Sequence, residues 1–187
     1  GAIAAVAERH TLLERPAVAN CSRVVVVVAL EQPRLDAQQL SRFLLTAERT
    51  GVTVDLVLTK ADLLPAVELQ GWCERLQGWG YEPLPVSALR GEGLEPLRRR
   101  LAQPGISVLC GPSGVGKTAL VEDFRRIAVE AGSRFATAKF EQLARGGPMQ
   151  GFARAVGELL RATIALPDER RAPIVARLRE EVGDRAA

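Results

Sequence analysis

The sequence predicts an α/β fold in which a mainly parallel sheet lies between two layers of helices, followed by a helical C-terminal segment. Short apolar runs alternate with segments of helical periodicity, at roughly thirty residues per strand–helix unit. The apolar runs are continuous and rich in Val, as expected for strands buried on both faces. A glycine-rich loop joins one such run to a helix, which is typical of the P-loop NTPase sandwich.

Composition supports one α/β domain with an appendage. The chain has 187 residues, of which 47% are hydrophobic and 4% aromatic, so Val, Leu and Ala must fill the core. Three Cys residues without a C-x-x-C pair and a single His indicate neither a zinc site nor a disulfide framework. The net charge of +3 is a mild basic bias that solvated helix faces explain. No secretory signal is visible and Val24–Leu30 is too short to span a membrane, so we expect a cytoplasmic protein without membrane contact.

The first elements follow from patterning. Residues 1–20 alternate loosely and are expected to form a strand or two and a connecting segment. The β-branched run 22–30 predicts a buried strand. Residues 36–49 carry apolar side chains at helical spacing, with Asp36 as N-cap and Gly51 ending the helix.

The same alternation continues to the glycine-rich loop and beyond it. Further strands are expected at 52–58, 84–86 and 106–110, and further helices at 65–79 and 94–101. After the loop we expect a helix through residue 131, a strand and turn over 134–142, and amphipathic helices over 149–166 and 167–182.

Gly111-x-x-x-x-Gly116-Lys117-Thr118 matches the P-loop pattern in its context of strand, turn and helix. Glycines permit backbone conformations that aim several N–H groups at phosphate oxygens, and the helix adds its positive end. Lys117 is predicted to reach the phosphates and Thr118 to ligate Mg²⁺, which makes these two the candidate catalytic residues. The predicted phosphate-binding residues are Gly111, Pro112, Ser113, Gly114, Val115, Gly116, Lys117 and Thr118.

Lysine usage supports this prediction. Only Lys60, Lys117 and Lys139 are lysines among 25 basic residues. A compact ammonium on a flexible stem is retained where a planar guanidinium does not fit.

Two other strand ends carry polar loops. Thr59-Lys60-Ala61-Asp62 follows the second buried strand, and Ser87-Ala88-Leu89 follows the third. Parallel strands bind ligands at their carboxyl ends, so both loops are expected beside the P-loop. An aspartate can accept hydrogen bonds from guanine N1–H and the 2-amino group, which adenine cannot supply. A lone Lys-Ala-Asp is more often a helix cap, and only its combination with the P-loop favours a guanine site.

In ordinary small GTPases the phosphate loop comes first and the guanine motif follows. Here the loops at 59–62 and 87–89 precede the P-loop, which is the order of a circular permutation. This order resembles the RsgA (YjeQ) ribosome-biogenesis GTPases. The matching stretches are Arg15–Asn20, Leu40–Leu44, Val57–Leu64, Gly78–Tyr81, Val86–Ala88 and Gly111–Lys117. The resemblance covers residues 1–118. It implies GTP hydrolysis to GDP with Mg²⁺, late assembly of the small ribosomal subunit, and rRNA contact. Residues 1–20 would then be the tail of an OB-fold domain, and 21–140 a permuted GTPase-like core.

The resemblance ends after Thr118. The Thr- and His-rich switch, the Asp-x-x-Gly segment and the zinc-binding module of that family do not appear in this sequence. Residues 119–187 look more like the start of a STAND/AAA-type ATPase domain, including the turn Lys139-Phe140-Glu141-Gln142. We therefore expect a helical segment at 141–187, no zinc, and impaired GTP turnover.

Three hypotheses follow. The first is a guanine nucleotide-binding protein with slow hydrolysis. The second is an ATP-binding module of a STAND/AAA-type signalling regulator, which leaves the loops at 59–62 and 87–89 unexplained. The third is a remnant whose P-loop serves folding alone.

Overall fold

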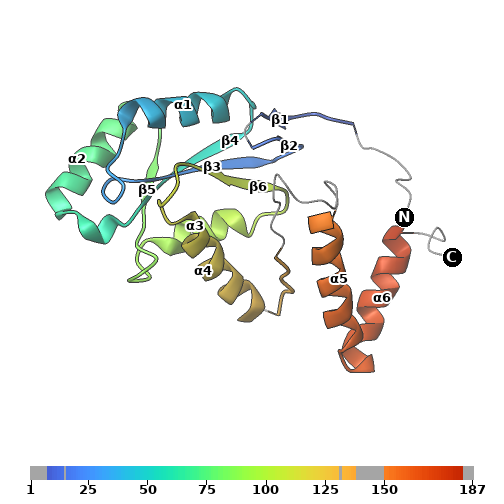
Figure 1. The fold of residues 1–187 in the computed structure, drawn as a ribbon. Coiled ribbons are helices and arrows are strands. Elements are labelled where there is room, and N and C mark those ends of the chain that lie inside the picture. Colours follow the sequence, from blue (N-terminus) through green and yellow to red (C-terminus); the bar gives the residue numbers. More distant parts are fainter. Residues whose placement is uncertain (1–7, 15, 131, 138–149, 183–187) are drawn as a thin grey trace. The chain divides into compact units, whose positions relative to one another are not determined.

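The computed structural model describes residues 8–14, 16–130, 132–137 and 150–182 (Figure 1). The chain divides into two compact units, residues 1–124 and 125–187. The boundaries expected at residues 20 and 140 remain predictions.

A parallel sheet forms the centre of the first unit. Its strands, in spatial order among the described residues, are β5 (Pro83–Pro85), β4 (Thr53–Thr59), β3 (Arg23–Ala29) and β6 (Ser107–Cys110). In register, Arg23 of β3 lies opposite Thr53 of β4 and Ser107 of β6. All these strands therefore end at the same edge of the sheet, where the loops of interest begin.

Strand β3 is the middle of the core because its side chains are buried on both faces. Val24, Val26 and Val28 pack toward one face, and Val25, Val27 and Ala29 toward the other. None of these six side chains is more than 2% exposed. A β-branched run of this kind suits a strand that has helices on both sides.

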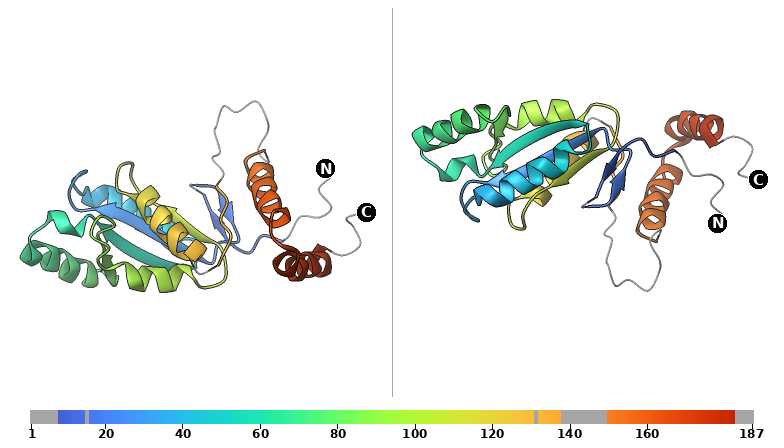
Figure 2. Two further views of the ribbon diagram at one scale, coloured as in Figure 1. Left: turned by 90° about the horizontal axis from the view of Figure 1, so that it is seen from below. Right: turned by 90° about the horizontal axis from the view of Figure 1, so that it is seen from above.

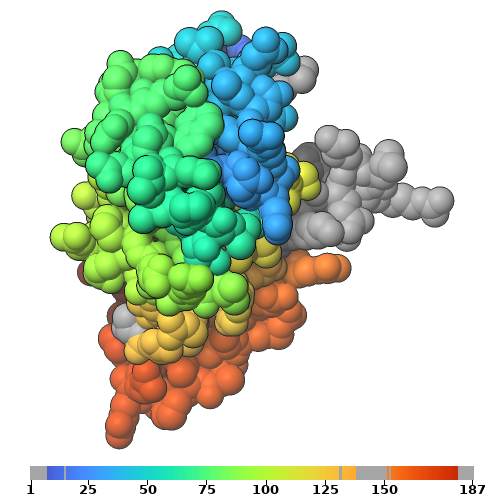
Figure 3. Space-filling view, turned by 90° about the vertical axis from the view of Figure 1, so that its left-hand side faces the viewer, coloured from blue at the N-terminus to red at the C-terminus, as the bar shows by residue number. Residues whose placement is uncertain are grey.

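Helices cover both faces, which confirms the predicted three-layer α/β sandwich (Figure 2). Helices α1 (Ala37–Glu48) and α2 (Ala66–Gln77) cover one face and lie next to each other on the surface (Figure 3). Helices α3 (Leu94–Leu101) and α4 (Lys117–Glu130) contribute Leu94, Leu97 and Leu120 to the other face. The expected strands and helices from 22 to 110 are thus confirmed, with ends that differ by at most two residues.

Helix α1 begins as predicted. The Asp36 carboxylate accepts hydrogen bonds from the backbone N–H groups of Gln38 and Gln39, at 2.8 and 3.1 Å. This cap satisfies donors that the first helical turn leaves free. Three turns of apolar side chains then bury Leu40, Leu44 and Ala47 against the sheet.

A buried ion cluster lies near the opposite end of the sheet. Asp55 of β4 is 3% exposed, and its two carboxylate oxygens pair with Arg23 at 2.5 Å and with Arg100. Arg23 also donates to the Gln103 side chain at 2.6 Å. Three segments far apart in the sequence, β3, β4 and the end of α3, are joined at this carboxylate.

The N-terminal residues form a short antiparallel hairpin, β1 (Leu12–Leu13) and β2 (Val18–Ala19). Asn20 closes it, since its side chain accepts from the His10 N–H at 2.8 Å and donates to the Glu8 carbonyl at 2.9 Å. The expected strand or two is confirmed within residues 8–20, whereas the assignment to an OB-fold stays a prediction.

The second unit contains helices α5 (Gln150–Ile164) and α6 (Asp168–Val182), as the periodicity predicted. The strand expected from residue 134 is wrong for residues 134–137, which have no strand pairing. Arg134 instead donates a hydrogen bond to the Thr163 hydroxyl of α5. Residues 138–142, with the predicted turn, lie outside the described residues. No helix in the described ranges is long and apolar enough to cross a bilayer.

Candidate nucleotide site

The glycine-rich loop leaves β6 at Cys110 and ends where α4 begins at Lys117. Gly111 has a φ of 146°, and a Cβ at this position would lie 1.9 Å from the Val27 carbonyl oxygen. Gly114 and Gly116 also have positive φ values, 80° and 89°. The loop therefore folds back against β3 with a backbone that only glycine allows at Gly111, and its concave side is built from backbone.

Lys117 and Thr118 lie in the first turn of α4. The Lys117 ammonium donates to the Gly111 carbonyl at 3.0 Å and to the Pro112 carbonyl at 2.6 Å, so the charge is held over the loop. The Thr118 side chain is exposed, whereas Val115 is 1% exposed and packs into the core. A backbone cradle, an ammonium above it and an exposed hydroxyl at a helix N-terminus fit a phosphate chain with its Mg²⁺.

Thr59, the first residue of the predicted guanine loop, faces the interior. It is 4% exposed, and its hydroxyl lies 2.6 Å from the Val115 carbonyl oxygen and 3.0 Å from that of Val28. Because a hydroxyl has only one proton, Thr59 donates its hydrogen bond to the nearer carbonyl, that of Val115. Thr59 thus ties the end of β4 to the phosphate loop, a position that the motif alone could not reveal.

Beyond Thr59 the two polar loops and the phosphate loop surround one pocket of about 270 Å³. Lys60 has a φ of 56°, and its ammonium donates to the Gln32 carbonyl, so its stem lies along the pocket wall. The Ala61 N–H is used within the fold, donating to the Val86 carbonyl at 3.1 Å. The residues that line the pocket are Gln32, Lys60, Asp62, Leu63, Ala88, Leu89, Gly116 and Ala119.

Ser87 is a buried residue whose hydrogen bonds hold the loop beside this pocket in place. It is 1% exposed, its backbone exchanges hydrogen bonds with Glu92 at 2.9 and 3.1 Å, and its Oγ accepts from the Arg90 N–H at 3.1 Å. A hydrogen bond from the Ser87 side chain lowers the pKa of Asp62, against the opposing effect of burial, and the Arg90 charge adds to the lowering. Asp62 is therefore a carboxylate at neutral pH, able only to accept hydrogen bonds.

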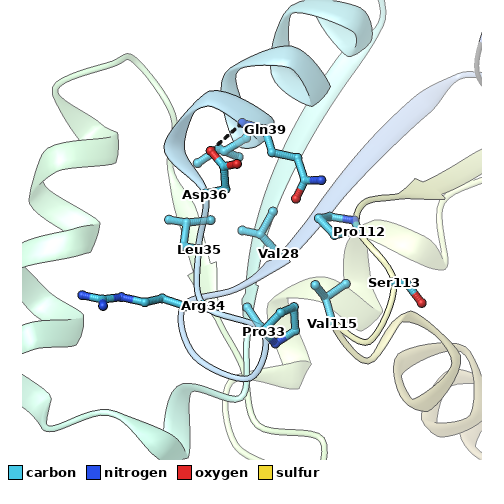
Figure 4. Close-up of a pocket in the computed structure, with 11 residues that line it drawn as sticks. Val28, Pro33, Arg34, Leu35, Asp36, Gln39, Pro112, Ser113 and Val115 are labelled. Atoms are coloured by element: carbon cyan, nitrogen blue, oxygen red, sulfur yellow. Dashed lines mark hydrogen bonds between the residues drawn. The ribbon is translucent and has the colours of Figure 1, made fainter.

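Sequence reasoning missed a second pocket, of about 290 Å³, on the other side of the phosphate loop (Figure 4). The segment between β3 and α1 forms one wall, with Pro33, Arg34, Leu35 and Asp36. Pro112 and Ser113 of the phosphate loop form the opposite wall, and Gln39 of α1 lies above them. No motif marks this segment, because its contact with the loop joins residues some distance apart in the sequence.

Comparison with known proteins accounts for the arrangement. The family model described as RsgA GTPase matches residues 6–136. The chain belongs to the RsgA GTPase family. A second family model, described as AAA ATPase domain, matches residues 86–187, so the latter part of the chain belongs to that family as well. Both matches include the phosphate loop. The sequence had predicted that the resemblance changes at this loop, from RsgA proteins before it to AAA-type ATPases after it.

Similar proteins agree with the RsgA assignment. Small ribosomal subunit biogenesis GTPase RsgA of Synechococcus sp. (strain CC9605) is 59% identical over 119 residues, which are 64% of this chain and 39% of that protein. The protein of the same name from Synechocystis sp. is 46% identical over 121 residues, 65% of this chain and 32% of that protein. The chain thus spans about two fifths or less of the length of these relatives.

Solved structures show the same fold. YjeQ from Thermotoga maritima has a TM-score of 0.57 and 31% identity, covering 64% of this chain and 44% of that one. YloQ, described as a circularly permuted GTPase, has a TM-score of 0.52 and 28% identity, covering 62% of this chain and 41% of that one. The predicted permuted order is thereby confirmed.

Proposed function

We propose that this chain binds guanine nucleotides, as the nucleotide-binding part of an RsgA-type protein that acts in small ribosomal subunit biogenesis. One observation carries the proposal. A single pocket brings Lys60, Asp62 and Ala88 together with Gly116 of the phosphate loop. A base held by the first three residues therefore lies beside phosphates held by the loop.

The base would be recognised through complementary hydrogen bonds. The Asp62 carboxylate accepts from guanine N1–H and the 2-amino group, and the Lys60 stem lies along the base plane. The Ala88 N–H serves guanine O6, since the Ser87 N–H already donates to Glu92. Leu89, which is 88% exposed at the pocket, covers the base. Thr59, Ala61 and Ser87 support this site by holding the loops in place.

The phosphates would lie on the backbone N–H groups of residues 113–117, with the Lys117 ammonium between them and Thr118 as a ligand of Mg²⁺. The metal neutralises charge on the phosphates when bound. Hydrolysis further needs an oriented water and charge stabilisation, and the sequence has no Asp-x-x-Gly segment to assist. We expect binding of GTP and GDP with slow turnover.

Partners and location follow from the family alone. The relatives are named as small ribosomal subunit biogenesis GTPases. We extend this to the present chain as a proposal: it contacts the small subunit and its rRNA in the cytoplasm.

Titration with fluorescent GDP and ADP tests the guanine site. GDP should bind at least tenfold more tightly than ADP, and Asp62→Ala should weaken GDP by about 10–100-fold, because hydrogen bonds to a charged group contribute about 1.5–3 kcal/mol. ADP binding to the variant is the internal control and should change little. Equal binding of both nucleotides by the parent chain contradicts the proposal.

A second candidate is an ATP-binding module, favoured by the AAA ATPase domain match over residues 86–187. It predicts tighter binding of ADP than GDP, and loss of that binding when residues 134–187 are deleted. If neither nucleotide raises the melting temperature at 100 times its expected dissociation constant, where about 2.7 kcal/mol of stabilisation is due, the loop serves folding alone.

A further inference from the structure

Two walls of the pocket with Asp62 belong to segments that lead into helices. Ala88 and Leu89 lie in the loop before α3, and Gly116 and Ala119 lie where the phosphate loop joins α4. In the proposed complex the base lies at the first wall and the phosphates at the second, as parts of one ligand. The separation of the two walls therefore decides whether both parts bind at once.

The first wall is joined closely to α3. The backbones of Ser87 and Glu92 exchange two hydrogen bonds, at 2.9 and 3.1 Å, which close the loop between them. Gly93 then starts the helix with a φ of 70°, and a Cβ at this position would lie 2.1 Å from the Pro85 carbonyl oxygen. The start of α3 thus lies directly against the end of β5, so a shift of α3 carries the loop with it.

Helices α3 and α4 lie next to each other (Figure 1), and Arg98 ties them together. Its Nε donates to Asp123 Oδ2 at 3.1 Å and its Nη2 to Asp123 Oδ1 at 3.0 Å. The two side chains are 24% and 16% exposed, beside a core cluster that contains Leu97 of α3 and Leu120 of α4. A bidentate pair fixes orientation as well as distance, so it determines how α3 lies against α4.

The three arginines at 98–100 have a simpler explanation, which is a solvated or nucleic-acid-binding helix face. Either face would leave all three side chains exposed. Arg100 instead pairs with the buried Asp55 carboxylate and Arg98 with Asp123, while Arg99 is the exposed one of the three. Two of the three arginines therefore join α3 to its neighbours.

We propose that Arg98 is a positioning residue for the nucleotide, because it holds the loop that binds guanine at a fixed separation from the loop that binds phosphate. Arg98 lies outside the set of residues that line the pocket. It acts through Asp123 on the helix that begins at Lys117, and through α3 on the loop with Ala88. This inference rests on the proposed guanine nucleotide binding. It predicts that Arg98 matters most for a ligand that engages both loops.

Breaking the pair tests this role. Arg98→Gln should weaken GDP by about fivefold or more, as for two sites that lose their coupling, whereas ADP, which gains little from the guanine loop, should change by less than about twofold. Arg98→Lys keeps the charge but cannot form the bidentate pair, so it should lower the same ratio in part. Both affinities are measured by titration well below the melting temperature of each variant. A loss of stability alone leaves the ratio of GDP to ADP affinity unchanged there.

Two control variants remove charges close to Arg98 and leave the pair with Asp123 intact. Arg99→Gln alters the exposed neighbour on the same helix. Glu95→Gln removes the other partner of Arg98, a carboxylate at 3.7 Å that is 69% exposed. Neither should change the ratio of GDP to ADP affinity.

Each outcome decides the inference. A lower ratio of GDP to ADP affinity for the Arg98 variants, with no change for the controls, supports it. An unchanged ratio, or an equal loss for both nucleotides, overturns it, while the preference of the parent chain for GDP still supports the proposed function. If Arg98→Gln melts below the assay temperature, Arg98→Lys decides by the same ratio. A parent chain that binds GDP no better than ADP overturns both proposals.

Discussion

The two units differ in what their side chains bury. In the first unit, strands and helices from distant parts of the sequence share a core in which Val24–Val28 are at most 1% exposed. In the second, Thr163 is the buried side chain among those described, while Leu160, Ile164 and Leu178 are 47%, 67% and 43% exposed. The candidate nucleotide site lies wholly on the first unit. Binding residues that must hold a fixed geometry are thus carried by the part of the chain with the larger core.

Removing a charge from the first unit should have the largest effect. Asp55→Ala leaves Arg23 and Arg100 without their shared carboxylate, and breaking a buried pair costs about 3–5 kcal/mol. Urea unfolding followed by circular dichroism measures the loss. Arg126→Ala is the matched control, since this ion pair with Glu130 joins side chains that are 58% and 61% exposed, and such pairs contribute about 0–1 kcal/mol. Equal losses for the two variants would contradict the contrast between the units.

A buried hydroxyl in each unit gives a closer comparison. Thr59→Val removes the bond that ties β4 to the Val115 carbonyl, leaving a buried acceptor at a cost of about 1–3 kcal/mol. Because Val115 belongs to the phosphate loop, GDP affinity should fall as well. Thr163→Val removes a bond to the Leu159 carbonyl one turn earlier in α5, which already lies within a helix. It also removes the bond that Thr163 accepts from Arg134, but Arg134 is exposed and can donate to water instead. We expect about 1 kcal/mol or less there, and no change in GDP affinity, measured by thermal melting and by titration.

The elements of the first unit could be predicted because each has a strong local signal. The five consecutive valines of β3 indicate a buried strand, and Asp36 with Leu40 and Leu44 indicates a capped amphipathic helix. The P-loop has a fixed spacing that its backbone geometry requires. Each of these signals lies within a few consecutive residues. They can therefore be recognised without knowing which other segments pack against them.

The missed features depend on contacts between distant residues. The motif is the same whether the Thr59 side chain faces a base or the Val115 carbonyl. The register of β3 and β4 decides which way this side chain points. The second pocket, between the phosphate loop and the segment that joins β3 to α1, arises because Pro33 and Gln39 meet Ser113 across the end of the sheet. Arg134 was expected in a strand, whereas its guanidinium bonds to Thr163 of α5. A local sequence pattern does not indicate such contacts between residues that are far apart in the chain.

The smallest effect is expected on the apolar surface of the second unit. Ile164 is 67% exposed at the end of α5, so Ile164→Ser should change the free energy of unfolding by less than about 0.5 kcal/mol, as for other surface substitutions. Val26→Ser, at a fully buried position of β3, is the contrasting variant. It removes a packed side chain and buries a hydroxyl, at a cost of about 2–5 kcal/mol. A loss above 1 kcal/mol for Ile164→Ser in urea unfolding would mean that this face is covered in solution, and that the second unit has a core of its own.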